Sequence, residues 1–149
     1  MKIFCDTSVL VAASFDNHPH HPEADAVLNR IYAGEDSGHA SAHTLAETFS
    51  VLSRMPSQPK LDPQAALKIL EDLIPHFTFV PLAVDDYLRS IRELTALKLG
   101  GGRVYDLLHL HAAGKAGVDR IYTFNAVEWK KLVPSLAAFI HVPPAVTQK

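Results

Sequence analysis

Three acidic residues stand where a folded chain could bring their carboxylates together. Asp6 directly follows a short apolar run, residues 3–5, and Glu47 lies beyond a second short expected strand, residues 39–41. Asp106 follows the glycine run 100–102. In an open parallel α/β sheet, ligand and metal sites form outside the carboxyl ends of the strands. Gathered carboxylates repel one another unless protons or cations compensate, and oxygen-only ligands favour hard cations such as Mg²⁺ or Mn²⁺.

Each of these acidic residues also has a simpler interpretation. Asp6 could cap a helix over residues 7–15, and Glu47 could complete a capping box with Thr44. Asp106 could favour a helix start through the helix dipole. Both interpretations stay open for each residue taken alone, and only convergence at one edge of a sheet favours the metal site.

The pattern of the chain predicts the elements that must position these residues. The expected strands are 2–5, 39–41, 77–80, 119–123 and 139–142, and the expected helices are 7–15, 22–33, 45–54, 62–74, 84–97, 104–116 and 125–132. Strands that alternate with helices indicate a parallel sheet covered on both faces. We therefore expect a three-layer α/β/α domain with a central, mostly parallel sheet of four to five strands. Right-handed crossovers would put the strand carboxyl ends on one edge.

Composition limits the class of protein. The chain has 149 residues, which is the size of one domain, and its hydrophobic content of 48% with 20% charged residues predicts a globular fold. A net charge of -2 argues against a protein held on nucleic acid by overall basicity. It leaves room for a nuclease with local basic groups. The single cysteine, Cys5, excludes an internal disulfide and is expected to be a small buried hydrophobe.

The sequence also predicts where the protein works. It has no apolar run of the ~18 residues needed to cross a membrane, and its start lacks the pattern of a signal peptide. We expect a cytoplasmic protein with no membrane partner. Residues 1–142 are expected to form the single domain, and residues 143–149 a loose tail.

Four segments together carry a family resemblance. They are Asp6-Thr7-Ser8-Val9-Leu10, Glu47 within ETFSVL, Asp106 within GGGRVYDLLHLHAA, and TFNAVEW at residues 123–129. In this order and at these distances, over about residues 2–142, they resemble the PIN domain. More narrowly, they resemble the VapC-type ribonuclease toxins of bacterial and archaeal toxin–antitoxin pairs. The first and third segments are the most specific.

The resemblance implies a PIN-like single-domain endoribonuclease that depends on Mg²⁺ or Mn²⁺, forms a homodimer and is silenced by a cognate antitoxin. Asp6, Glu47 and Asp106 match the family's three core acidic ligands, and Thr7 or Ser8 matches a hydroxyl that supports the metal site. In such a site a metal-activated water attacks the RNA phosphodiester in line, so no histidine or tyrosine base is required.

The chain departs from the family pattern at the fourth acidic position. Asn125 stands where the family often has aspartate. An asparagine can orient a ligand or a water molecule but brings no charge. Glu128, three residues further on, could substitute if its longer side chain reaches the site. The fourth ligand is therefore left open between Asn125 and Glu128.

Several other polar residues are candidates for supporting roles. Arg103 could hold an RNA phosphate in a bidentate manner. His109, one helical turn after Asp106, could contact the site or a phosphate, or could pack half buried against the sheet. The histidines of loop 18–22 lack the spacing of a zinc site, and we expect a solvated loop.

Two other functions compete with a nuclease. A receiver-like signalling domain would need a phosphoacceptor aspartate at the end of a central strand and a late lysine, and neither is found at the expected segments, Phe79-Val80-Pro81 and Thr123-Phe124-Asn125. A catalytically impaired PIN-fold module could bind RNA or protein without cleavage. Asn125 favours this second alternative, whereas the retention of all three core acidic residues argues against it.

Overall fold

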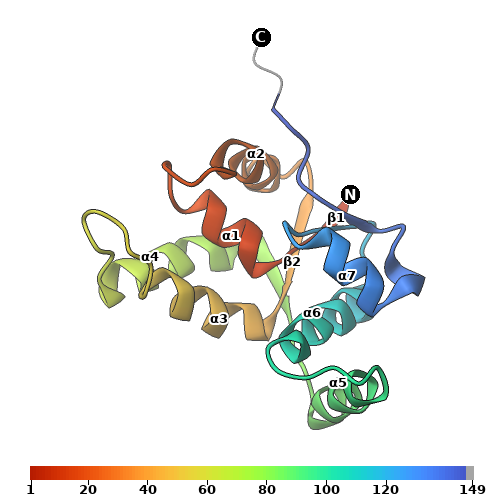
Figure 1. The fold of residues 1–149 in the computed structure, drawn as a ribbon. Helices are drawn as coiled ribbons and strands as arrows, with labels where there is room; N and C mark the ends of the chain where they lie inside the picture. The colour runs from red at the N-terminus through yellow and green to blue at the C-terminus, as the bar shows by residue number, and fades with distance from the viewer. Residues whose placement is uncertain (147–149) are drawn as a thin grey trace.

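A five-stranded parallel sheet forms the centre of the computed structural model, which describes residues 1–146 (Figure 1). The strands are β1 (Lys2–Cys5), β2 (Ser37–Ser41), β3 (Phe77–Val80), β4 (Arg120–Tyr122) and β5 (Ile140–His141). Their order is β3-β2-β1-β4-β5, and every neighbouring pair is parallel. The strand order reverses at β1, so the point just beyond Cys5 is the topological switch point where open α/β sheets bind ligands.

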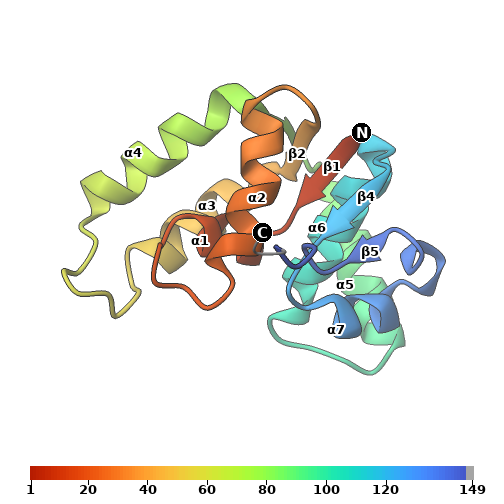
Figure 2. The same ribbon diagram turned by 90° about the horizontal axis from the view of Figure 1, so that it is seen from above.

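Helices cover both faces of this sheet, which confirms the expected three-layer α/β/α architecture. One group is α1 (Thr7–Ala13), α2 (His21–Tyr32), α3 (Ala42–Leu52) and α4 (Pro63–Leu73), and the other is α5 (Val84–Ala96), α6 (Arg103–Ala116) and α7 (Ala126–Leu132). Two short 3₁₀ helices, η1 (Ile74–His76) and η2 (Pro134–Leu136), precede β3 and β5. Seen from above, the first group lies on one side of the strands and the second on the other (Figure 2).

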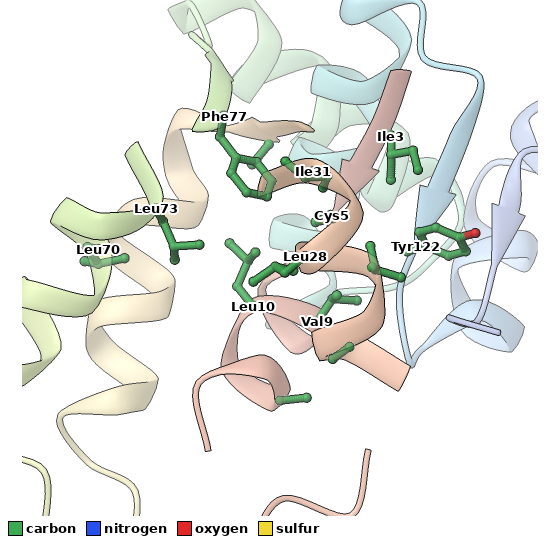
Figure 3. Close-up of a cluster of buried hydrophobic side chains, with 14 residues drawn as sticks. Ile3, Cys5, Val9, Leu10, Leu28, Ile31, Leu70, Leu73, Phe77 and Tyr122 are labelled. Carbon is green, nitrogen blue, oxygen red and sulfur yellow. The ribbon is translucent and has the colours of Figure 1, made fainter. Parts of the chain in front are cut away.

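The central strand β1 contributes to a hydrophobic core on each face. Ile3 and Cys5 pack into the cluster under α1 and α2, which Figure 3 shows, whereas Phe4 packs with α6 and α7 around the fully buried Trp129. Successive side chains of a strand point to opposite faces, and a parallel strand covered on both sides is apolar throughout. The prediction that Cys5 is a small buried hydrophobe is confirmed, because the thiol is free and fully buried.

Helix α3 begins earlier than predicted, and its cap is a different residue. The helix starts at Ala42, and the Ser41 hydroxyl accepts a hydrogen bond of 3.2 Å from the backbone N–H of Thr44. The predicted capping box of Thr44 with Glu47 is therefore wrong. Ser41 takes this role because it ends β2 with an extended backbone (φ -75°, ψ 152°) that turns its side chain back over the helix. Glu47 consequently lies in the second turn of α3.

The remaining element ends differ from the predicted ones by at most two residues. Residues 142–146 form neither helix nor strand, although Pro143 is buried. Residues 147–149 of the predicted tail lie outside the described residues. Among residues 1–146, every helix is too short or too polar to cross a lipid bilayer.

Gly38 in β2 allows a close approach between the sheet and its neighbours. A Cβ atom at this position would lie 2.9 Å from Cγ2 of Ile31 and 3.1 Å from the backbone oxygen of His76. We expect Gly38→Ala to lower the free energy of unfolding by about 1–3 kcal/mol, because overpacking against the backbone costs that much. Gly114→Ala in α6 is the matched control, since its new Cβ meets nothing within 4 Å and alanine favours a helix. Urea denaturation measures both effects, and a Gly38→Ala variant as stable as the parent would contradict the prediction.

Candidate active site

The three predicted acidic residues meet at the carboxyl edge of the sheet. Asp6 follows β1, Glu47 comes from α3, and Asp106 comes from the first turn of α6. All three line one cavity of about 340 Å³. The other residues that line it are Thr7, Ser8, Val11, His18, His20, Val51, Phe124 and Asn125. Asp6, Glu47 and Asn125 come after the neighbouring parallel strands β1, β2 and β4, whose carboxyl ends lie at one edge of the sheet. Helix α6 contributes Asp106 to this edge from its first turn.

The Asp6 carboxylate is held by two hydroxyl groups. Its Oδ2 accepts hydrogen bonds from Ser8 Oγ at 2.7 Å and from Thr123 Oγ1 at 2.8 Å. The backbone N–H of Asp6 donates to the backbone carbonyl oxygen of Tyr122 at 3.0 Å, and the backbone N–H of Phe124 donates to Ser8 Oγ at 3.1 Å. Asp6 makes no side-chain capping bond to α1. The hydroxyl groups leave the second carboxylate oxygen of Asp6 out of this network.

Glu47 is held by a buried histidine. The Oε2 atom of Glu47 lies 3.0 Å from Nε2 of His109, and Nδ1 of His109 lies 2.8 Å from Ser41 Oγ. His109 is fully buried, and its ring stacks on Trp129 with 5.9 Å between centroids. We call these three hydrogen-bonded residues the Ser41–His109–Glu47 network. It joins the end of β2 to α6 and α3, and it leaves no face of His109 exposed to RNA.

Opposite shifts in pKa indicate that Glu47 and His109 form an ion pair. Burial alone would raise the pKa of Glu47, but the hydrogen bond and charge of His109, together with His43 and Thr7, outweigh it, and the net pKa is lowered. Burial alone would lower the pKa of His109, but the hydrogen bond that it donates to Glu47 and the negative charges of Asp6, Glu47 and Asp106 together outweigh it, and the net pKa is raised. A carboxylate paired with an imidazolium is therefore the favoured state.

Asp106 carries the strain of gathering negative charge. Burial, followed by repulsion from Asp6, raises the pKa of Asp106 to about 6 from its ordinary value of 3.8. The indole N–H of Trp129 opposes this shift, although it makes no hydrogen bond of ordinary geometry to any described residue. Asp106 therefore gives up its proton only at a higher pH than an ordinary aspartate does.

The donor set fits a hard divalent cation. The three carboxylates, the hydroxyls of Thr7 and Ser8 and the amide group of Asn125 offer oxygen atoms, which Mg²⁺ and Mn²⁺ prefer. The Thr7 hydroxyl lies near Glu47 but is buried without a hydrogen-bond partner among the described residues. Residues 1–146 contain no group of three or more His, Cys, Asp or Glu side chains arranged to hold a metal ion. The fit thus rests on the oxygen donors, the unpartnered Thr7 hydroxyl and the raised pKa of Asp106.

The two candidates for a fourth oxygen ligand lie in different places. Asn125 lines the same cavity as Asp6. Glu128 is exposed, and its Oε1 accepts a hydrogen bond from Lys131 Nζ at 3.0 Å. It lines a neighbouring hollow of about 240 Å³ that also contains Arg103. Asn125 therefore shares a cavity with all three carboxylates, whereas Glu128 shares a hollow with Asp106 but not with Asp6 or Glu47.

Sequence reasoning missed several residues around the cavity. His18 and His20 line it, and the His20 ring stacks on Phe124 with 4.4 Å between centroids. The third histidine, His21, instead lies 3.1 Å from the backbone oxygen of Ala12 through its Nδ1. No periodic pattern predicts the path of such a loop. Thr123 could have been predicted from the sequence, because it directly follows β4 just as Asp6 directly follows β1.

Comparison with known proteins identifies the family of the chain. Residues 3–132 match the family model of the PIN domain. Ribonuclease VapC40 of Mycobacterium tuberculosis is 35% identical over 112 residues, which cover 75% of this chain and 78% of the relative. Ribonuclease VapC27 of the same species is 30% identical over 110 residues, covering 74% of this chain and 75% of the relative.

Solved structures share the fold. Mycobacterium tuberculosis VapC20, a toxin that cleaves the sarcin–ricin loop, superposes with a TM-score of 0.70 at 22% identity over 95% of this chain and 99% of its own. The Rickettsia felis VapBC2 structure, bound to a promoter DNA fragment, gives a TM-score of 0.66 at 18% identity over 95% and 98%. With its parallel sheet, its acidic cavity and these relatives, the chain belongs to the PIN-domain family and, within it, to the VapC-type ribonuclease toxins.

Proposed function

We propose that this toxin cuts RNA with Mg²⁺ or Mn²⁺ bound by Asp6, Glu47 and Asp106, with Asn125 as a neutral fourth oxygen ligand. The observation that carries the proposal is the convergence of the three carboxylates in one cavity at the switch point of the sheet. When bound there, such an ion lowers the pKa of water and stabilises charge on the phosphate oxygens. The curated relatives, both named ribonucleases, support RNA as the substrate.

The residues of the chain itself hold the acidic groups in place. Ser8 and Thr123 fix the direction of the Asp6 carboxylate through short hydrogen bonds. His109 fixes one oxygen of Glu47 and compensates its charge. Asp106 is ionised at neutral pH, since its pKa of about 6 lies below 7. Thr7 supplies a buried hydroxyl beside Glu47.

Two residues have roles outside the set of ligands. His109 is a positioning residue for Glu47 and not an RNA contact, because it is fully buried and both of its ring nitrogens have protein partners. Arg103 is exposed beside Asp106 in the neighbouring hollow. Its guanidinium is suited to hold a phosphate of the bound RNA in a bidentate manner.

We also propose that the toxin acts in the cytoplasm, assembles as a homodimer and is silenced by a cognate antitoxin. The Rickettsia felis VapBC2 structure, in which a protein of the same fold is part of such a pair, supports the antitoxin as a partner. The competing function, a PIN-fold module that binds RNA or protein without cleaving it, is favoured by Asn125 alone. Cleavage that requires a divalent ion separates the two functions.

Replacement of Asp6 tests the catalytic assignment. We expect the parent to cleave RNA only with Mg²⁺ or Mn²⁺, and Asp6→Ala to lose about 1000-fold or more of this activity, because a site that loses a core ligand loses several kcal/mol of charge stabilisation. Asp16→Ala is the matched control, since the Asp16 side chain is 98% exposed outside the cavity. Circular dichroism checks that both variants fold. A folded Asp6→Ala variant that cuts RNA at the parental rate would refute the assignment.

Neutralisation of Asp106 separates stability from activity. Because the pKa of Asp106 in the folded chain is about 6, above its ordinary value of 3.8, folding favours the protonated carboxyl group. The contribution of Asp106 to the free energy of unfolding is therefore complete below about pH 4 and is lost as the pH rises through about 6. Asp106→Asn avoids this loss. We expect the variant to be inactive, yet more stable than the parent in metal-free buffer near pH 7.5. Solvent screening of this partly exposed group reduces the gain to about 1 kcal/mol.

Urea denaturation with a chelator measures this gain near pH 7.5, and the same experiment near pH 4 should show none. Added Mg²⁺ should stabilise the parent and leave Asp106→Asn unchanged, because only the parent retains the full ligand set. A variant that is no more stable than the parent near pH 7.5 would show that Asp106 is not under electrostatic strain.

Two substitutions of His109 test its positioning role. The amide nitrogen of glutamine can take the place of Nε2, which faces Glu47, whereas that of asparagine can take the place of Nδ1, which faces Ser41. We expect His109→Asn to raise the Mg²⁺ concentration for half-maximal cleavage about 10- to 100-fold, as the loss of a group that orients a ligand does. His109→Gln should raise it much less. A purely structural role would instead lower the stability of both variants and leave their Mg²⁺ dependence like that of the parent.

A further inference from the structure

We propose that Tyr105 and Arg54 form a nucleotide-binding subsite beside the carboxylate cavity, in which the tyrosine ring stacks on a nucleobase of single-stranded RNA and the guanidinium holds a phosphate. This inference rests on the proposed ribonuclease function and deepens it. It concerns how the substrate is held. Neither Tyr105 nor Arg54 is a proposed metal ligand, although Glu47 also lines the hollow that they share.

Tyr105 presents a ring that is fixed in place and yet exposed. It stacks on His43 with 5.0 Å between centroids and an interplanar angle of 8°. Tyr105 nevertheless remains 47% exposed. One ring face is thus covered by the imidazole, and the other is available. A pre-oriented aromatic ring loses little conformational entropy when it binds a partner.

The hollow beside this ring adjoins the acidic cavity. Its volume is about 320 Å³, and its lining residues are His43, Ala46, Glu47, Ser50, Val51, Arg54 and Tyr105. Glu47 and Val51 line both this hollow and the acidic cavity. A nucleotide in the hollow is therefore the neighbour of a phosphate in the cavity.

Arg54 supplies the positive charge that a phosphate needs. It is exposed, and its Nε donates a hydrogen bond of 3.0 Å to the backbone oxygen of Ser50. This bond uses one of the five N–H groups of the guanidinium and orients the rest. Among residues 1–146, no carboxylate forms an ion pair with Arg54.

Helix α6 places Asp106 between two candidate RNA contacts. Each residue of an α-helix advances by about 100° around the axis, so Arg103 lies about 60° to one side of Asp106 and Tyr105 about 100° to the other. Asp106 lines both the acidic cavity and the hollow of Arg103. An RNA strand that crosses the cavity would thus meet a cation on one side and an aromatic ring on the other.

The chemistry of the subsite favours single-stranded RNA. Stacking on an aromatic ring accepts any unpaired base, and a nearby arginine adds attraction for the backbone. The chain carries a net charge of -2, so affinity for RNA must come from such local groups and not from overall charge.

Fluorescence anisotropy with a labelled single-stranded RNA of roughly 12 nucleotides and mixed sequence tests the subsite. We expect Tyr105→Ala to weaken RNA binding about 5- to 100-fold, as the loss of one stacked base does, and Tyr105→Phe to bind like the parent. Tyr32→Ala is the matched control, because Tyr32 is also exposed (42%) and also contacts a histidine, His76, but lies in α2 outside the hollow. It should bind like the parent.

Arg54→Ala gives a second, independent measurement. Loss of one phosphate contact should reduce the slope of log affinity against log salt by about 0.7 for a single strand. The Mg²⁺ concentration for half-maximal cleavage at saturating RNA should stay at the parental value in both Tyr105→Ala and Arg54→Ala, because neither residue holds the ion.

The outcomes distinguish the subsite from the proposed function. If the parent cleaves RNA with Mg²⁺ while Tyr105→Ala binds the RNA as tightly as the parent does, the subsite is refuted and the ribonuclease function stands. If the affinity of Arg54→Ala for RNA depends on salt as that of the parent does, the proposed contact between Arg54 and a phosphate is refuted, and the ribonuclease function again stands. A parent that neither binds nor cleaves the RNA would refute both.

Discussion

The burial of three carboxylates beside one another at the end of β1 is the constraint on which the rest of the site depends. The backbone brings Asp6, Glu47 and Asp106 to one cavity, and the groups that surround each carboxylate differ. Two hydroxyls hold Asp6, an imidazole holds Glu47, and Asp106 is left with a pKa of about 6. The apoprotein therefore keeps part of its negative charge uncompensated. That unfavourable energy is what a bound cation would relieve.

The sheet and α6 share the task of maintaining this arrangement. The strand order reverses beside β1, so the residues that follow β1 and β4 reach one edge from both sides of the switch point. Helix α6 adds Asp106 toward the cavity and His109 one turn later toward Glu47. Trp129 packs against His109 from α7 and limits its movement. The rigidity of the apolar core thus extends directly into the site.

The sequence was sufficient for the layers, the parallel sheet and the three acidic residues, because short apolar runs and their carboxyl ends are local patterns. It was insufficient where contacts between distant segments decide. Thr44 with Glu47 matched a capping box, but Ser41 caps α3 because β2 ends at that residue. The depth of His109 depends on packing against Trp129, which no spacing predicts. The stacking of Tyr105 on His43 likewise depends on how α6 lies against α3.

The Ser41 hydroxyl serves both the secondary structure and the site, because one of its partners lies at the start of α3 and the other is His109. It accepts the hydrogen bond that begins α3, and it contacts the histidine that holds Glu47. A substitution of Ser41 therefore affects both the start of α3 and the position of His109. A replacement tolerated by the helix, such as another capping side chain, would still have to fit a fully buried imidazole. We therefore expect strong epistasis between positions 41 and 109, so that these two positions diverge by paired changes.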